Sequence, residues 1–141
     1  MAEAAPAPPD LRTRVEFFVS DPARSIAFYE RLGFEVLRSG WGYTLLDRDG
    51  SRIGLQDDAY ARDHPHYFSE HLDRFPRGTG VEVSVDVADE EALRALHASA
   101  SAMGCVVREI VNRPWGAVDF RIADPDGYFV RFTTPLSAAG E

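Results

Sequence analysis

The chain of 141 residues is short of several features that mark particular classes of protein. It has one cysteine, Cys105, so no disulfide can form within it. No apolar run approaches the ~20 residues that a membrane-spanning helix needs, and the opening MAEAAPAPPD lacks the basic and apolar segments of a signal peptide. These absences predict a cytoplasmic protein without a membrane partner.

Basic side chains are also fewer than acidic ones. The chain has 15 basic against 23 acidic side chains, a net charge of −8. This balance argues against a nucleic-acid partner, whose phosphates would be repelled, and mildly favours a neutral or cationic ligand. Ser-His-Asp spacing and phosphate-binding glycine loops are missing too, so the sequence predicts no catalytic residue and no cofactor.

The sequence does contain an internal repeat. Asp47 and Gly50 recur 77 residues later as Asp124 and Gly127, each time within an Asp-x-Asp-Gly motif that follows an apolar run and precedes a strand-like one. The constant offset predicts two related supersecondary units. We interpret each motif as the turn of the last hairpin of its unit.

The order of predicted elements is the same in both units. A strand at 14–20 leads into a helix that begins at Asp21 and Pro22 and ends by Gly33, and three short strands follow, the last two joined at Asp49-Gly50. A strand at 80–88, a helix between Asp89 and Gly104 and three more strands repeat the βαβββ order. The fold class is therefore predicted as α+β, with two βαβββ modules forming a cupped mixed sheet and helices on its outer face.

Five segments follow from this reading. They are a disordered N-terminal tail (1–13), the first module (14–56), a linker (57–79) with one helical turn around 68–72, the second module (80–134) and a C-terminal tail (135–141).

Alternation along the strands separates an apolar face from a polar face. The apolar set, expected under the helices, is Val15, Phe17, Val19, Ile53, Leu55, Val81, Val83, Val85, Val87, Val130 and Phe132. The polar set is Arg14, Glu16, Phe18, Arg52, Gly54, Gln56, Glu82, Ser84, Asp86, Phe129, Arg131 and Thr133. This polar face is either solvated exterior or the lining of a wet cavity.

Two stretches of the chain resemble a known family. VSDPARSIAFYERLGFEVL near the start and RPWGAVDFRIADPDGYFVRFTTP near the end are similar to the vicinal oxygen chelate superfamily of glyoxalases, bleomycin resistance proteins and dioxygenases. The resemblance spans about residues 14–134 and is greatest to the antibiotic-binding branch. It implies that the paired modules curl into a cup, with the polar face inside.

The metal-using members of that superfamily carry one His, Glu or Gln ligand on the first and last strand of each module. The resemblance places these four slots at Arg14, Gly54, Glu82 and Arg131, and an alternative match puts Glu16 in the first slot. Divalent cations need three or four donors without cationic competitors. We therefore predict no metal, and expect Glu82 and Arg131 to form an ion pair.

The four histidines leave two interpretations open. His64, His66 and His71 lie in the linker and His97 on the second helix, so none is on a cup-facing strand. A linker histidine could serve in a His-x-His metal site or as a base over the cup. The interpretation we favour is that all are exposed to solvent.

Aromatic side chains at turns and in the linker indicate a flat organic ligand. The predicted ligand-binding residues are Trp115, Trp41, Tyr43, Phe18, Gln56, Glu82, Ser84, Arg131 and Phe68. The resemblance implies a homodimer that sequesters an aromatic antibiotic or planar metabolite, without metal, in a cup shared by two chains. The alternative is a lyase, isomerase or dioxygenase that depends on a metal or uses Glu82 or Glu16 as base.

Overall fold

The computed structural model describes residues 5–135, which contain the two predicted βαβββ modules and the linker between them. The first comprises β1 (Val15–Val19), α1 (Pro22–Glu30), β2 (Glu35–Gly40), β3 (Tyr43–Arg48) and β4 (Ser51–Asp57). The second comprises β5 (Glu82–Asp86), α3 (Glu90–Met103), β6 (Val106–Asn112), β7 (Val118–Ala123) and β8 (Phe129–Thr133). The α+β class and the repeated element order are confirmed.

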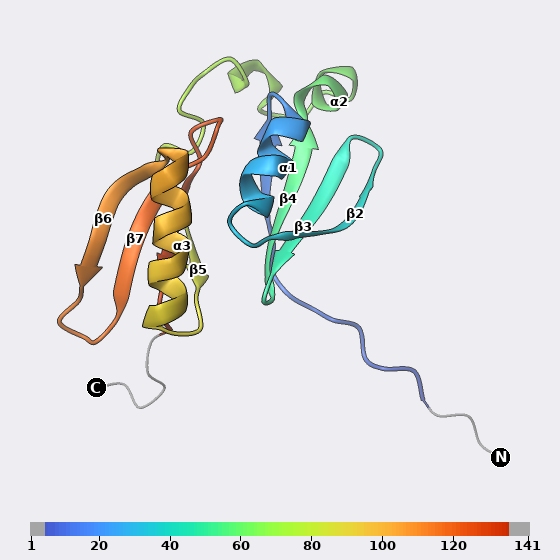
Figure 1. Ribbon diagram of the computed structural model, residues 1–141. Helices are drawn as coiled ribbons and strands as arrows, with labels where there is room; N and C mark the ends of the chain where they lie inside the picture. Colours follow the sequence, from blue (N-terminus) through green and yellow to red (C-terminus); the bar gives the residue numbers. More distant parts are fainter. Residues whose placement is uncertain (1–4, 136–141) are drawn as a thin grey trace.

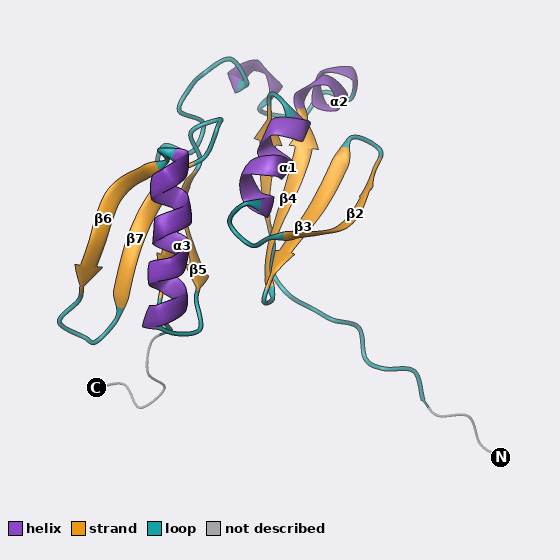
Figure 2. Cartoon of the chain, in the orientation of Figure 1, coloured by secondary structure: helices purple, strands orange, loops and turns teal. Residues whose placement is uncertain are grey.

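Each module builds its own four-stranded mixed sheet. The strand orders are β1-β4-β3-β2 and β5-β8-β7-β6, with β1 parallel to β4 and β5 parallel to β8. The sheets lie side by side with β1 and β5 as neighbouring edges, and α1 and α3 cover the same side of the pair (Figures 1 and 2). Within residues 5–135 no strand of one sheet pairs with a strand of the other. The expected cupped sheet is thus two separate sheets placed edge to edge.

Local sequence signals account for both long helices. The side chain of Asp21 accepts a hydrogen bond from the backbone N–H of Arg24, and Pro22 occupies the first turn of α1. Asp89 caps α3 in the same way through the N–H of Ala92. Gly104 ends α3 with φ of 71°, a left-handed conformation in which glycine has no steric penalty.

The apolar strand faces pack beneath these helices as predicted. Eight of the eleven expected core side chains are buried, and they join α1 and α3 side chains in one core that includes both modules. The buried eight are Phe17, Val19, Ile53, Leu55, Val85, Val87, Val130 and Phe132. Val15 and Val83 are partly buried. The prediction is wrong for Val81, which is 62% exposed because it precedes the first residue of β5.

The linker is more ordered than the sequence indicated. The expected helical turn is present as a 3₁₀ turn at Ser69–His71, but a helix, α2 (Asp58–Asp63), was not predicted. Asp57, the last residue of β4, caps this helix by accepting from the N–H of Ala59. The linker therefore leaves the sheet directly as a helix.

The two Asp-x-Asp-Gly motifs have different structures. Asp49 and Gly50 form a two-residue hairpin turn with φ of 49° and 96°, as expected. The second motif is also the turn of its hairpin, between β7 and β8, but it has a further role. Asp124 and Asp126 are buried, and Asp126 accepts a hydrogen bond from the hydroxyl of Ser20 in the first module at 2.5 Å.

Further contacts make this loop the junction between the modules. The hydroxyl of Tyr29 on α1 donates to Asp124 at 2.7 Å. The hydroxyl of Tyr128 donates to the carbonyl of Phe18 on β1 and accepts from its N–H, at 2.9 and 3.1 Å. The ring of Tyr128 also stacks on Phe17 with centroids 4.1 Å apart. Buried polar groups on one module are thus satisfied by the other.

Parts of both predicted tails, residues 1–4 and 136–141, lie outside the described residues. Residues 5–14 form neither helix nor strand, although Arg12 donates to the carbonyl of Gly50 in the β3–β4 turn. Cys105, half-buried, precedes β6 and does not lie within a strand. Among the described residues no helix is both long enough and apolar enough to cross a bilayer.

Replacing Asp124 with asparagine should change the pH dependence of stability. Burial raises the pKa of Asp124 from 3.8 to about 6, although hydrogen bonds from Tyr29 and two backbone N–H groups oppose the rise. The folded state therefore binds this proton more tightly than the unfolded state. The resulting stabilisation is fully present below a pH of about 4 and is lost as the pH rises through about 6.

Asparagine does not titrate, so the free energy of unfolding of the parent should fall relative to D124N by at most about 3 kcal/mol across this window. Urea denaturation at several pH values measures the difference. D63N, at an exposed carboxylate in α2, is the matched control and should track the parent. A parent–D124N difference independent of pH would contradict the prediction.

Candidate functional site

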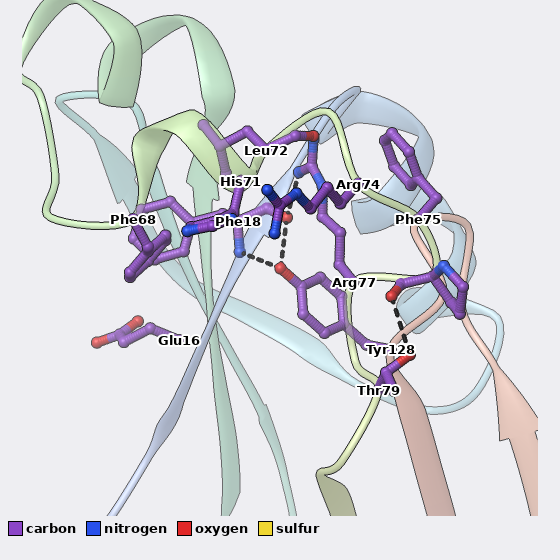
Figure 3. A pocket seen from close by; sticks show the side chains of 11 residues that line it. Glu16, Phe18, Phe68, His71, Leu72, Arg74, Phe75, Arg77, Thr79 and Tyr128 are labelled. Carbon is purple, nitrogen blue, oxygen red and sulfur yellow. Dashed lines mark hydrogen bonds between the residues drawn. The ribbon is translucent and has the colours of Figure 1, made fainter.

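A cavity of about 580 Å³ lies between the polar face of β1 and the linker. We call it the linker cavity. Its size is in the range of pockets that hold one small organic molecule. The lining residues are Glu16, Phe18, Phe68, His71, Leu72, Arg74, Phe75, Pro76, Arg77, Thr79 and Tyr128 (Figure 3).

Aromatic rings form much of the wall. Phe18 points from β1 toward Phe68 of the linker, and the rings meet edge to face with centroids 4.6 Å apart. Phe75 stands on the other side in Figure 3 and is 57% exposed. Tyr128 contributes its ring from the second module. Burial raises the pKa of its hydroxyl to about 12, so it stays protonated at neutral pH.

Arg77 fixes the linker over the cavity. Its guanidinium group makes two hydrogen bonds to the carboxylate of Asp58, at 2.8 and 2.7 Å, and donates to the carbonyls of Phe18 and Leu72. The side chain is 5% exposed. With its hydrogen bonds directed to protein groups, Arg77 is a structural residue that joins linker, α2 and β1.

The floor of the first sheet is closed by its own side chains. Glu16 and Gly54 face each other across β1 and β4, and the Glu16 carboxylate and Tyr43 hydroxyl lie where a Cβ at position 54 would be. Arg14 donates to both, at 2.7 and 3.0 Å. Burial, followed by hydrogen bonding to Glu16, raises the pKa of Tyr43. Tyr43 is thus tied to Glu16 and Arg14.

The second sheet carries a charged network that the sequence analysis missed. Asp119 on β7 is 1% exposed and accepts two hydrogen bonds from Arg113, at 2.9 and 3.0 Å. Burial alone would raise the pKa of Asp119, but Arg113, Arg121 and Arg131 outweigh it and the pKa is lowered. The alternation of apolar and polar residues along β7 could have predicted this network. Val118, Phe120 and Ile122 face the core, so the residues between them, which include Asp119, lie on the polar face.

The predicted ion pair between Glu82 and Arg131 is present but loose. The Arg131 Nε and Glu82 Oε1 atoms are 3.8 Å apart, whereas Arg121 Nε lies 2.9 Å from the other carboxylate oxygen. Ser84, not Glu82, is the direct neighbour of Arg131 across β5 and β8. The main partner of Glu82 is therefore Arg121.

These four strand positions do not fit a divalent cation. In the strand register, Glu16 on β1 is the neighbour of Gly54 on β4, and Ser84 on β5 is the neighbour of Arg131 on β8. Because Glu16, and not Arg14, is beside Gly54, the register favours Glu16 as the first of the four positions. One position has no side chain and another is a guanidinium group, and Glu16 is itself held by Arg14. Within residues 5–135 no group of three or more His, Cys, Asp or Glu side chains could hold a metal.

The two tryptophans predicted to bind ligand lie outside the linker cavity. Trp41, 88% exposed, is at the β2–β3 turn with φ of 58°, an uncommon conformation for a bulky residue. Gln56 supports this turn by donating to the carbonyl of Gly42. Trp115, 52% exposed, is at the β6–β7 turn, where the Arg113 guanidinium lies 5.9 Å from its ring centre. Among the predicted ligand-binding residues, only Phe18 and Phe68 line the cavity.

The linker histidines are exposed, as favoured. His71 nevertheless lines the linker cavity, and the ring of His66 lies 5.2 Å from that of Phe18. The interpretation is wrong for His97, which is on α3, only partly exposed, and bonded to Glu109 at 2.7 Å, away from the cavity. Within residues 5–135, His71 is therefore the one linker histidine in the lining of the cavity, which is where a histidine that acts as a base would have to lie.

Comparisons with known proteins agree with this architecture. A glyoxalase-family protein from Burkholderia phytofirmans PsJN has 21% identity and a TM-score of 0.69, over 86% of this chain and 95% of that one. Lactoylglutathione lyase from Agrobacterium tumefaciens has 18% identity and a TM-score of 0.64, over 91% and 96%. A bleomycin-binding protein solved with bleomycin has 19% identity and a TM-score of 0.59, over 88% and 98%.

Identities this low show a common fold only, and no curated protein matches the chain. The model of one protein family, however, matches residues 13–132. The chain belongs to the Glyoxalase/Bleomycin resistance protein/Dioxygenase superfamily.

Proposed function

We propose that this protein binds a small aromatic molecule without a metal and sequesters it, as a homodimer. The observation that carries the proposal is the linker cavity, whose walls include Phe18, Phe68, Phe75 and Tyr128. Flat rings gain affinity by packing against such side chains. The bleomycin-binding protein of similar fold is a precedent for holding a ligand in this architecture.

The alternative is an enzyme that uses Glu16 or Glu82 as base, and the contacts of both favour binding over catalysis. Glu16 lines the linker cavity but is paired with Arg14 at 2.7 Å. Glu82 lies in a different depression, beside Arg121. In both cases a guanidinium partner competes with a substrate proton for the carboxylate.

Exposed apolar side chains on the outer edge strands support dimerisation. Val36 and Leu37 on β2 and Val107 and Val111 on β6 are each more than 40% exposed. In the described part of the chain, β2 and β6 each pair with a single strand. A second copy that covers these edges would bury the apolar groups and protect strands that otherwise invite aggregation. Trp41 and Trp115, largely exposed in one chain, would then be available to a crevice shared by two.

Ligand binding should depend on the cavity aromatics. Once a thermal-shift screen of aromatic antibiotics and planar metabolites identifies a ligand, Phe68→Ala should weaken its binding by roughly 1–3 kcal/mol, as for loss of an aromatic hot spot. Calorimetry measures the change. Tyr67→Ala removes the adjacent, 90% exposed ring outside the lining and is the matched control. Equal effects of the two variants would count against the cavity.

The role of Trp115 is a separate prediction. If a shared crevice includes this ring, Trp115→Ala should also weaken binding by roughly 1–3 kcal/mol, and ligand should quench tryptophan fluorescence. A folded, dimeric Trp115→Ala protein that binds as tightly as the parent would show that the indole serves only to pack against Arg113.

Protein purified without chelators is expected to contain no bound divalent metal, because guanidinium groups compete at the strand positions that would supply ligands. Mass spectrometry of the intact preparation for zinc, nickel, iron and manganese tests this. Near-stoichiometric metal that is lost on Glu82→Ala or Glu16→Ala would overturn the metal-free proposal and favour the enzyme.

Light scattering at micromolar concentration should give twice the mass of one chain. Leu37→Glu places a charge on the exposed edge of β2 and should shift the mass toward the monomer. Ala98→Glu, on the exposed side of α3, is the control and should not. A monomeric parent would refute the dimer.

A further inference from the structure

We propose that the ligand of the linker cavity is an aromatic carboxylate, with Arg74 as its counter-ion. The inference rests on the proposed function and adds the charge of the bound molecule. The sequence alone favoured a neutral or cationic ligand, on the basis of the net charge of −8. The local charge of this cavity has the opposite sign.

The first step is a comparison of the charged side chains that line the cavity. Glu16 is neutralised by Arg14, and Arg77 by Asp58. His71 lies 3.7 Å from Glu70, which compensates it if it is protonated. Arg74 differs from them all: within residues 5–135 its side chain makes no ion pair with a carboxylate and no hydrogen bond. The lining therefore presents one uncompensated positive charge.

The second step is the position of that charge relative to the rings. Figure 3 shows the Arg74 side chain directed from the linker toward the middle of the cavity, between the Phe18–Phe68 pair and Phe75. A flat ring packed against Phe18 and Phe68 would bring a substituent within reach of Arg74. A guanidinium group is planar and offers parallel N–H donors that match the two oxygens of a carboxylate.

The polar face of the second sheet carries a net charge of the same sign as Arg74. Four arginines face three carboxylates there, a small local excess of positive charge in an acidic protein: Arg108, Arg113, Arg121 and Arg131 with Glu82, Asp86 and Asp119. Fields from such a group extend over about a Debye length, roughly 8–10 Å at physiological salt. An anion that comes within this distance of these arginines is also attracted by their excess charge.

Three probes with one ring system separate charge from shape. They are 2-naphthoate, 2-naphthylmethanol and 2-naphthylmethylammonium, each titrated into the full-length protein by calorimetry at low salt. We expect 2-naphthoate to bind about tenfold more tightly than the alcohol, as for one charge-assisted hydrogen bond in a partly exposed site. The ammonium compound should bind more weakly than the alcohol.

Arg74→Gln should reduce the affinity for 2-naphthoate about tenfold, to that of the alcohol, and leave the alcohol unchanged. Arg38→Gln makes the same change of charge on the exposed strand β2, outside the cavity, and should leave all three affinities unchanged. Unchanged 2-naphthoate binding in Arg74→Gln, or tighter binding of the ammonium compound, would overturn the assignment of charge.

Phe68→Ala makes failure of this inference distinguishable from failure of the proposed function. If the alcohol binds the parent and binds Phe68→Ala more weakly, the cavity is a binding site whatever the preference for charge. If none of the three probes binds the parent, both the charge assignment and the cavity as a site for flat rings are refuted.

Discussion

The arrangement of the molecule depends on the burial of two carboxylates in one loop. Asp124 and Asp126 lie in the β7–β8 connection of the second module but find partners in the first, at Tyr29 and Ser20. A buried carboxylate left without partners would cost several kcal/mol. Because no backbone pairing joins the two sheets in residues 5–135, these contacts and the shared apolar core fix how the modules sit together.

The linker cavity is a consequence of that junction. Tyr128 follows the buried carboxylates in the same loop, and its hydroxyl bonds to Phe18, so the loop that joins the modules also supplies a wall of the cavity. Arg77 adds the second constraint by tying the linker to Asp58 and β1. The walls are positioned by hydrogen bonds between segments distant in sequence, so the cavity forms only when the whole chain is folded.

This dependence explains which features could be predicted from sequence. Caps such as Asp21 and Asp89 act within one helical turn, and strand alternation is also local, so both were predictable. The two Asp-x-Asp-Gly motifs have similar letters, and only distant partners distinguish a simple turn from a junction. The position of Asp119 on the polar face could also have been predicted from the alternation along β7. The contribution of the linker to the cavity could not be predicted, because no local pattern specifies what Phe68 or Arg77 contacts.

The closed floor of the first sheet bears on where specificity resides. Position 54 has no side chain, and Glu16 and Tyr43 occupy the space where a Cβ would lie. Because Arg14 holds both groups, this part of the cup is filled by the protein itself. The open space is then the linker cavity, where Phe68, Arg74 and Phe75 are supplied by a connecting segment and not by the sheet. Changes at Phe68, Arg74 or Phe75, unlike changes at Arg77, therefore alter the shape and charge of the cavity without removing a hydrogen bond that holds the linker in place.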